Sequence, residues 1–172
     1  LAMLLVEAGM KRDVDVVVQT SAKTDPAAKK TNQVILHDPT NPVGTKLLAE
    51  KSSLITFENE WIDIPSLLSL QTNGVSFVPR LESIRPLINK ITQRELLNSL
   101  DIPCPDWLPI PLKKSSDFDV PADWKFPLMA KAAKGGYDGK GTKIIKNLNQ
   151  LQEFLVVERE QQWMLEKWVS FD

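Results

Sequence analysis

Hydrophobic residues in the first hundred positions gather in short runs separated by polar stretches. The runs rich in β-branched residues are Asp15–Gln19, Gln33–Leu36 and Ser53–Phe57. Continuous apolar runs of this length are typical of strands buried on both faces of a parallel sheet. Residues 43–51 and 64–71 carry apolar residues at helical spacing, and Asn73-Gly74 turns into a fourth short strand at 75–78. This alternation predicts an α/β domain built on a doubly wound parallel sheet.

The second part of the chain follows a different pattern. Two helices are predicted over 81–89 and 92–100, and a proline-rich stretch, Pro103 to Pro111, comes next. Because proline interrupts helices, we expect a domain boundary near residue 102. It separates a Rossmann-like, parallel-sheet domain over 1–101 from a small α+β domain over 102–172. The elements predicted for the second domain are strands at 107–110, 128–131, 142–145 and 163–167 and a helix at 148–157.

Composition and charge exclude several classes of protein. The chain has 172 residues, of which 42% are hydrophobic and 25% charged, which is ordinary for a globular protein. Its 21 basic and 22 acidic residues nearly cancel, so no overall field favours nucleic acid or a membrane surface. The lone Cys104 excludes an internal disulfide, and the lone His37 offers no metal-binding cluster. We therefore expect a soluble, cytoplasmic protein that binds any anion locally.

A glycine-rich segment between two predicted strands is the strongest chemical signal. Gly135 to Gly141 reads Gly-Gly-Tyr-Asp-Gly-Lys-Gly and holds four of the seven glycines. Glycine lets backbone N–H groups turn toward an anion, and lysine adds charge. Neither a P-loop nor a dinucleotide fingerprint fits, because Lys140 is followed by Gly141 and the segment leads into a strand rather than a helix. The pattern predicts a flap over a nucleotide.

Three separate stretches carry a resemblance to a known family. They are Ile55–Glu60, Asn89–Arg94 together with Leu100–Pro105, and the glycine segment with its internal Tyr137-Asp138. The chain resembles the ATP-grasp carboxylate-amine ligases, and within them the family of 5-(carboxyamino)imidazole ribonucleotide synthases. The Tyr-Asp pair discriminates most, because ATP-grasp enzymes in general share only the glycines and the flanking lysine. The fold implied is a Rossmann-like domain followed by the first, small subdomain of an ATP-grasp domain.

The resemblance implies an ATP-dependent ligase of purine biosynthesis that joins bicarbonate to the amine of aminoimidazole ribonucleotide through carboxyphosphate. ATP binding would involve Lys131 on the strand before the flap, a second lysine at the end of the first domain, the flap itself, and a hinge that receives adenine. The implied ATP contacts are Lys90, Lys131, Gly136, Tyr137, Asp138, Gly139, Lys140, Gly141, Thr142, Glu166, Lys167, Trp168 and Val169. Each lysine has the alternative role of a solvated surface charge.

The same resemblance implies that Tyr137, Asp138 and Glu58 face the ribonucleotide, with Glu60 as the rival of Glu58. Members of the family extend further at both ends, so the chain is expected to be truncated there and to correspond to about the first half of such an enzyme. The Mg²⁺ ligands are expected beyond Asp172, and none within the chain. The resemblance also implies a homodimer at full length, and little ATP affinity or activity for these residues alone.

Two alternatives stay open on the sequence. A second purine ATP-grasp ligase, the formate-dependent glycinamide ribonucleotide transformylase, shares the architecture, although Tyr137-Asp138 argues against it. The other is a non-catalytic nucleotide-binding module descended from such an enzyme. Sequence beyond Asp172 would separate these interpretations, because a ligase must supply two acidic metal ligands and a basic phosphate site.

Overall fold

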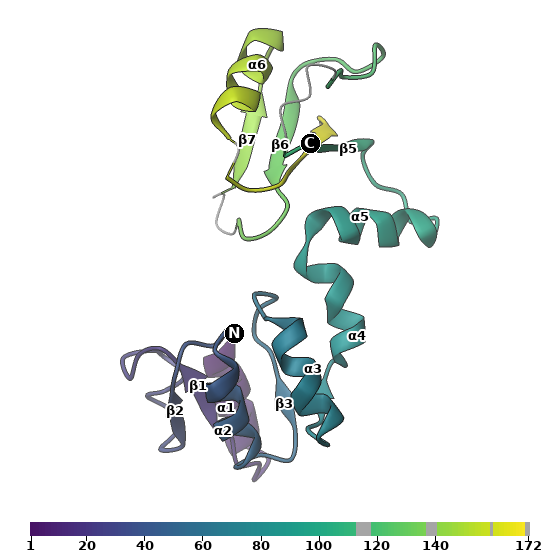
Figure 1. Cartoon of the computed structure of the whole chain (residues 1–172). Coiled ribbons are helices and arrows are strands. Elements are labelled where there is room, and N and C mark those ends of the chain that lie inside the picture. Colours follow the sequence, from purple (N-terminus) through teal and green to yellow (C-terminus); the bar gives the residue numbers. More distant parts are fainter. Residues whose placement is uncertain (113–117, 137–140, 159, 171–172) are drawn as a thin grey trace. The chain divides into compact units, whose positions relative to one another are not determined.

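The computed structural model describes residues 1–112, 118–136, 141–158 and 160–170, and it divides into two compact units, Leu1–Arg85 and Pro86–Asp172. Helices and strands occur in both units, which confirms the mixed α/β composition (Figure 1). The expected flap residues Tyr137, Asp138, Gly139 and Lys140 lie outside the described residues.

The first unit contains short parallel strands and amphipathic helices. The helices are α1 (Ala2–Met10), α2 (Pro42–Ala49), α3 (Ile64–Thr72) and α4 (Leu81–Ile84), and the strands are β1 (Val18–Thr20), β2 (Val34–Leu36), β3 (Ile55–Thr56) and β4 (Phe77–Val78). Strand β1 pairs with β2 and strand β3 with β4, both in parallel. The parallel pairing was expected, but the two pairs are separate, so a single doubly wound sheet is not confirmed within the described residues.

Helix α2 approaches the first strand pair closely because its third residue is glycine. A Cβ on Gly44 would come within 2.4 Å of the Cβ of His37 and within 2.6 Å of the amide nitrogen of Gln19. The side chain of Gln19, the middle residue of β1, donates to the carbonyls of Asp38 and Asn41, and it accepts from the hydroxyl of Thr45 at 3.1 Å. The Cβ of His37 therefore lies close against Gly44 of α2.

The second unit is built on one antiparallel sheet. Its elements are the 3₁₀ turn η1 (Arg85–Ile88), which begins at the boundary, helices α5 (Lys90–Ser99) and α6 (Leu148–Val157), and strands β5 (Trp107–Ile110), β6 (Leu128–Ala132), β7 (Thr142–Ile145) and β8 (Trp163–Lys167). The strand order is β5-β8-β6-β7, so β8 is the long central partner of both β5 and β6. Pro109 is accommodated because β5 is an edge strand.

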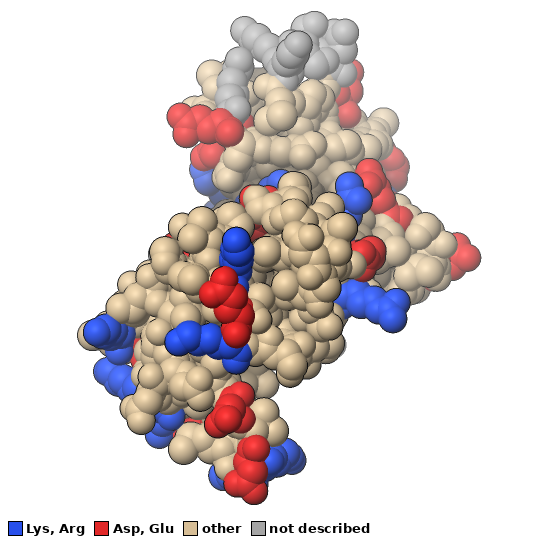
Figure 2. Space-filling view, turned by 60° about the horizontal axis from the view of Figure 1, so that its bottom comes forward, with Lys and Arg blue, Asp and Glu red and all other residues tan. Residues whose placement is uncertain are grey.

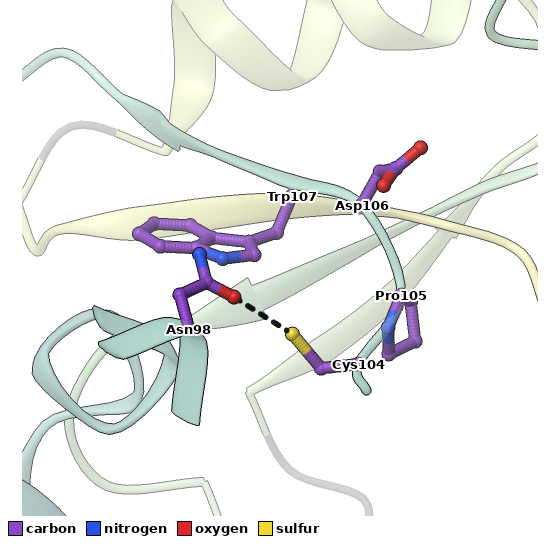
Figure 3. A pocket seen from close by; sticks show the side chains of 5 residues that line it. All are labelled: Asn98, Cys104, Pro105, Asp106 and Trp107. Atoms are coloured by element: carbon purple, nitrogen blue, oxygen red, sulfur yellow. Dashed lines mark hydrogen bonds between the residues drawn. The ribbon is translucent and has the colours of Figure 1, made fainter. Parts of the chain in front are cut away.

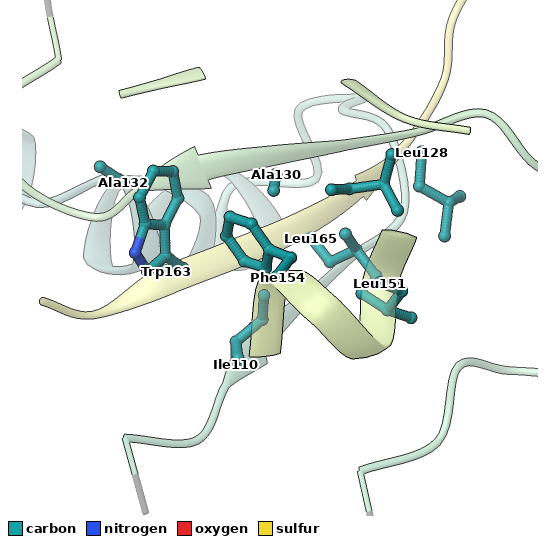
Figure 4. Packing of buried hydrophobic residues seen from close by; sticks show 9 residues of the cluster. Ile110, Leu128, Ala130, Ala132, Leu151, Phe154, Trp163 and Leu165 are labelled. Carbon is teal, nitrogen blue, oxygen red and sulfur yellow. The ribbon is translucent and has the colours of Figure 1, made fainter. Parts of the chain in front are cut away.

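The two faces of this sheet differ, because side chains alternate along each strand. Leu128, Ala130 and Ala132 of β6 and Trp163 and Leu165 of β8 point to the face covered by α6 (Figure 4). That cluster also contains Ile110, Ile145, Leu151 and Phe154. The opposite face carries Met164, which is buried with Ala133 and with Ile91 of α5.

Helix α5 belongs to the second unit, although the expected boundary lay near residue 102. Asn89 caps the helix by accepting from the Ile91 backbone N–H at 2.8 Å, and the Lys90 backbone N–H donates to the Ala133 carbonyl at 2.7 Å. With Ile91 buried against Ala133 and Met164, the helix packs on the sheet beyond the proline-rich stretch. The prolines therefore lie within the second unit, between its first helix and its first strand.

Candidate functional site: a buried carboxylate between two cations

The side chain of Lys131 lies where the β6–β7 hairpin opens into the glycine-rich segment. In the ladder, Lys131 pairs with Thr142, and the next backbone N–H, that of Ala132, donates to the Gly141 carbonyl at 2.8 Å. The expectation that the glycine segment joins two strands is confirmed. Because Leu128, Ala130 and Ala132 occupy the α6 face, alternation places Lys131 on the opposite face, toward α5.

Glu166 lies diagonally across from Lys131 on the central strand. The β6–β8 register pairs Met129 with Glu166 and Lys131 with Met164, so Lys131 and Glu166 are diagonal neighbours on one face. The Lys131 ammonium forms an ion pair with Oε2 of Glu166. Only 2% of the Glu166 side chain is exposed, against 28% for Lys131. A buried carboxylate requires a counterion, and Lys131 supplies one.

Arg94 of α5 supplies a second counterion to the same carboxylate. Its Nε and one terminal nitrogen contact Oε1 of Glu166 at 2.6 and 2.5 Å, and its side chain is 18% exposed. This arginine was not among the site residues expected from the sequence. The available signal was its position four residues after Lys90, which places both cations on one face of the helix.

Lys90 reaches the start of the glycine segment. Its ammonium donates to the Gly135 carbonyl at 3.0 Å. Gly135 and Gly136 both have positive φ, +65° and +80°, and Gly141 has φ of +77°. A Cβ on Gly141 would lie 2.9 Å from the Gly136 Cα, so the two ends of the segment approach closely. The structure thus brings Lys90, Lys131 and the ends of the glycine segment together within the second unit.

The residues expected to form the adenine hinge separate at the end of β8. Glu166 points toward α5, whereas Lys167 points to the other face, where its ammonium pairs with Asp106 at 2.7 Å and Asp123 at 2.9 Å. These two hydrogen-bonded carboxylates raise the pKa of Lys167, and the Lys167 hydrogen bond lowers the pKa of Asp123. Trp168 and Val169 follow the strand and are exposed. The adenine roles of these residues stay predictions.

Glu58 and Glu60 lie after β3 in the first unit, where neither side chain is buried. The side-chain amide of Asn59 donates to a carboxylate oxygen of Glu58 at 3.4 Å, and the Asn59 side-chain oxygen accepts from the Trp61 backbone N–H at 3.0 Å. The proposed contact of Glu58 or Glu60 with a ribonucleotide stays a prediction.

Cys104 contributes to a pocket of about 240 Å³ in the second unit (Figure 3). The lining residues are Asn98, Cys104, Pro105, Asp106 and Trp107. The Cys104 thiol donates to the Asn98 side-chain oxygen at 3.2 Å. Neither Lys131 nor Glu166 is among the lining residues, although Trp107 is the β5 partner of Glu166 in the ladder.

Two further features concern the distribution of charge on one face and the metal-binding groups among the described residues. In the face shown in Figure 2, basic and acidic side chains are interspersed rather than gathered into a field of one sign. Within the described ranges, no three His, Cys, Asp or Glu side chains lie close enough to hold a metal ion. The helices of that part of the chain include none with the length and apolar character needed to cross a membrane.

Part of the second unit matches a known domain family, and the whole chain has curated relatives. Residues 95–172 match the ATP-grasp domain family. The whole chain is 35% identical to N5-carboxyaminoimidazole ribonucleotide synthase of Synechococcus elongatus and 36% identical to that of Synechocystis sp., spanning 43% and 42% of their lengths. The chain thus spans less than half the length of these curated relatives.

A solved structure shows the same fold. N5-carboxyaminoimidazole synthetase from Staphylococcus aureus, complexed with ADP, superposes with a TM-score of 0.89 at 24% identity, covering 100% of this chain and 46% of that one. These similarities confirm the resemblance inferred from the glycine segment and its flanking stretches. The chain therefore carries an ATP-grasp match over residues 95–172 and is similar along its whole length to part of N5-carboxyaminoimidazole ribonucleotide synthase.

Proposed function

We propose that this chain supplies part of the ATP site of a ligase that carboxylates 5-aminoimidazole ribonucleotide with bicarbonate, using ATP. The observation that carries the proposal is the pair of cations, Lys131 and Lys90, beside the glycine segment that joins β6 and β7. The chain that holds them is similar throughout to proteins named N5-carboxyaminoimidazole ribonucleotide synthase. Lys131 and Lys90 flank a segment whose glycines have positive φ. Fixed cations beside such backbone suit a nucleotide phosphate.

In this proposal Lys131 and Lys90 contact phosphate oxygens, and residues 136–142 cover the triphosphate. The reaction transfers the γ-phosphoryl group to bicarbonate and then the carboxyl group to the ribonucleotide amine, releasing ADP and phosphate. Positioned cations would stabilise the charge that develops on the transferring phosphoryl group. Tyr137, Asp138 and Glu58 are proposed to contact the ribonucleotide, and residues 166–169 to contact adenine.

Further parts of the proposal concern the protein as a whole. We propose that Mg²⁺ accompanies ATP and that its ligands are other than the described residues. We also propose a homodimeric assembly and a cytoplasmic location. Nucleic acid and membrane are not included as partners. The first unit is proposed to be the Rossmann-like domain of the family, because its two strand pairs are parallel and helices follow β2 and β3.

The test uses the complete gene product that carries this sequence. Purified protein is incubated with Mg·ATP, bicarbonate and aminoimidazole ribonucleotide, and ADP release is followed in a coupled assay. The expected result is ADP release that requires the ribonucleotide. A second arm replaces the substrates with formate and glycinamide ribonucleotide, and activity only there would identify the transformylase instead. ATP binding without ADP release in either arm would indicate a non-catalytic module and overturn the proposal.

A further inference from the structure

We propose that Arg94 is a positioning residue of the phosphate site: it neutralises Glu166, so that the charge of Lys131 remains available to an anionic ligand. The ligand class is a polyphosphate, and ATP as its natural form rests on the proposed function. Among the interactions of the described residues, Arg94 makes no contact with Lys131. It acts on the lysine through the Glu166 carboxylate that both cations contact.

The two cations divide the carboxylate between them. Nε and one terminal nitrogen of Arg94 both contact Oε1 of Glu166, at 2.6 and 2.5 Å, while the Lys131 ammonium contacts Oε2. The guanidinium is always charged and presents its donors as a rigid fork, so it holds Oε1 without help from the lysine. Lys131 is therefore one of two counterions, and its remaining ammonium donors stay available at a side chain that is 28% exposed.

The net charge of Arg94, Glu166 and Lys131 determines how strongly this cluster attracts an anion. Two cations and one carboxylate leave one net positive charge beside the glycine segment. Without Arg94, Lys131 would be the sole counterion of a carboxylate with 2% exposure, and the remaining pair would be neutral. A buried carboxylate competes strongly for its only cation, because leaving it unpaired is costly. The attraction of Lys131 for phosphate would fall accordingly.

The backbone fixes the position of Arg94 relative to Lys131. Its helix is capped by Asn89, and the Lys90 backbone N–H is bonded to the Ala133 carbonyl just after β6. Ile91 is buried on the same helix. The guanidinium is therefore held against the sheet by the first turn of α5, and it does not depend on the placement of the glycine segment.

The experiment is a charge cycle in the complete gene product, with magnesium tripolyphosphate as the probe in calorimetric titrations. KM for ATP is a second readout for the variants that leave Glu166, a proposed adenine contact, unchanged. Tripolyphosphate has no base, so its affinity reports on the phosphate site and not on adenine contacts. The variants are Arg94→Met, Arg94→Lys, Glu166→Gln and the double variant Arg94→Met/Glu166→Gln. Lys146→Met, which removes an exposed cation from the same unit, serves as the control.

Arg94→Met is expected to weaken tripolyphosphate binding roughly 10- to 100-fold, the range for loss of a charge-assisted contact. Arg94→Lys keeps the positive charge but loses the fork that contacts Oε1, so it is expected to weaken binding less than Arg94→Met does. Lys146→Met is expected to remain within about threefold of wild type. The decisive comparison is between the effect of Arg94→Met in the wild-type protein and its effect in the Glu166→Gln variant. The Glu166→Gln background has no anion to neutralise, so adding Arg94→Met to it is expected to change affinity less than about threefold.

An equal loss from Arg94→Met in both backgrounds would overturn the inference, because a merely structural arginine would act regardless of the charge at position 166. Thermal melting of each variant verifies folding. If Arg94→Met does not fold, Glu166→Gln alone decides: removing the anion should leave tripolyphosphate affinity unchanged or raised, and a weakened affinity would contradict the proposal. Failure of ribonucleotide-dependent turnover in wild type, with the charge cycle as expected, would overturn the proposed function and leave this inference standing.

Discussion

Replacing Leu165 with alanine tests the packing that supports the candidate site. Leu165 has 0% exposure and lies on β8, the strand shared by β5 and β6, opposite Leu108 and Ala130. Its side chain belongs to the cluster under α6 shown in Figure 4. The next residue along the strand is Glu166, so the same backbone that carries the leucine also carries the carboxylate.

The expected loss follows from the burial. Leu165→Ala removes three carbon atoms, worth about 2.4 kcal/mol at about 0.8 kcal/mol each, and it leaves a cavity. The neighbouring Phe154 and Trp163 rings are locked edge to face, with centroids 5.0 Å apart, which limits collapse into the space. We therefore expect a total loss of about 3 to 5 kcal/mol. With an m value of roughly 3 kcal/mol per molar, the guanidinium midpoint should fall by about 1 to 1.7 M.

Tryptophan fluorescence during guanidinium denaturation measures this loss. Of the five tryptophans, only Trp61 lies in the first unit, so the signal follows mainly the second. Leu148→Ala is the matched control, because Leu148 is 56% exposed at the start of α6, and the change should cost less than about 0.5 kcal/mol. Equal midpoint shifts for the two variants, or a shift below about 0.3 M for Leu165→Ala, would refute the assigned packing.

Two further predictions concern the ends of the sheet. Gly141→Ala should cost at least about 1 kcal/mol more than Gly74→Ala in denaturation experiments. Both residues have positive φ, but only at Gly141 would the new Cβ meet a neighbour, the Gly136 Cα at 2.9 Å; equal losses would show that this backbone yields. The pKa of Asp123 is lowered by its hydrogen bond from Lys167, so its contribution to stability is present above the ordinary aspartate pKa and lost as pH falls below about 4. Asp123→Asn should therefore lessen the fall in Tm between about pH 4 and pH 2, and an equally steep fall would contradict this linkage.

The elements of the second unit could be predicted from sequence almost to the residue. The strands at 107–110, 142–145 and 163–167 and the helix at 148–157 coincide with β5, β7, β8 and α6. Their apolar runs are short and bracketed by polar or glycine-rich stretches, so local pattern and final packing agree. In the first unit the parallel pairing was predictable, whereas β3 and β4 are only two residues long and their relation to β1 and β2 depends on tertiary contacts.

The candidate site was only partly predictable. Lys131 followed from its position before the glycine segment, and Lys90 from the resemblance. The role of Arg94 required knowing that α5 packs on the sheet and that β6 places Lys131 diagonally from Glu166, a contact partner of Arg94 across 72 residues of sequence. No local pattern encodes that register. The proline-rich stretch indicates a boundary after this helix, so the sequence pattern alone does not place Arg94 beside the sheet.

The attachment of α5 to the sheet has a practical meaning for dividing this protein. The sequence pattern predicts a domain boundary at the proline-rich stretch. A shortened protein that began there would lack both Ile91 and Arg94. Ala133 and Met164, with 1% and 0% exposure, would lose their cover, and Glu166 would keep a single counterion. A piece intended to retain the ATP-grasp portion should therefore begin no later than Pro86, with the helix treated as the first element of that portion rather than the last of the preceding one.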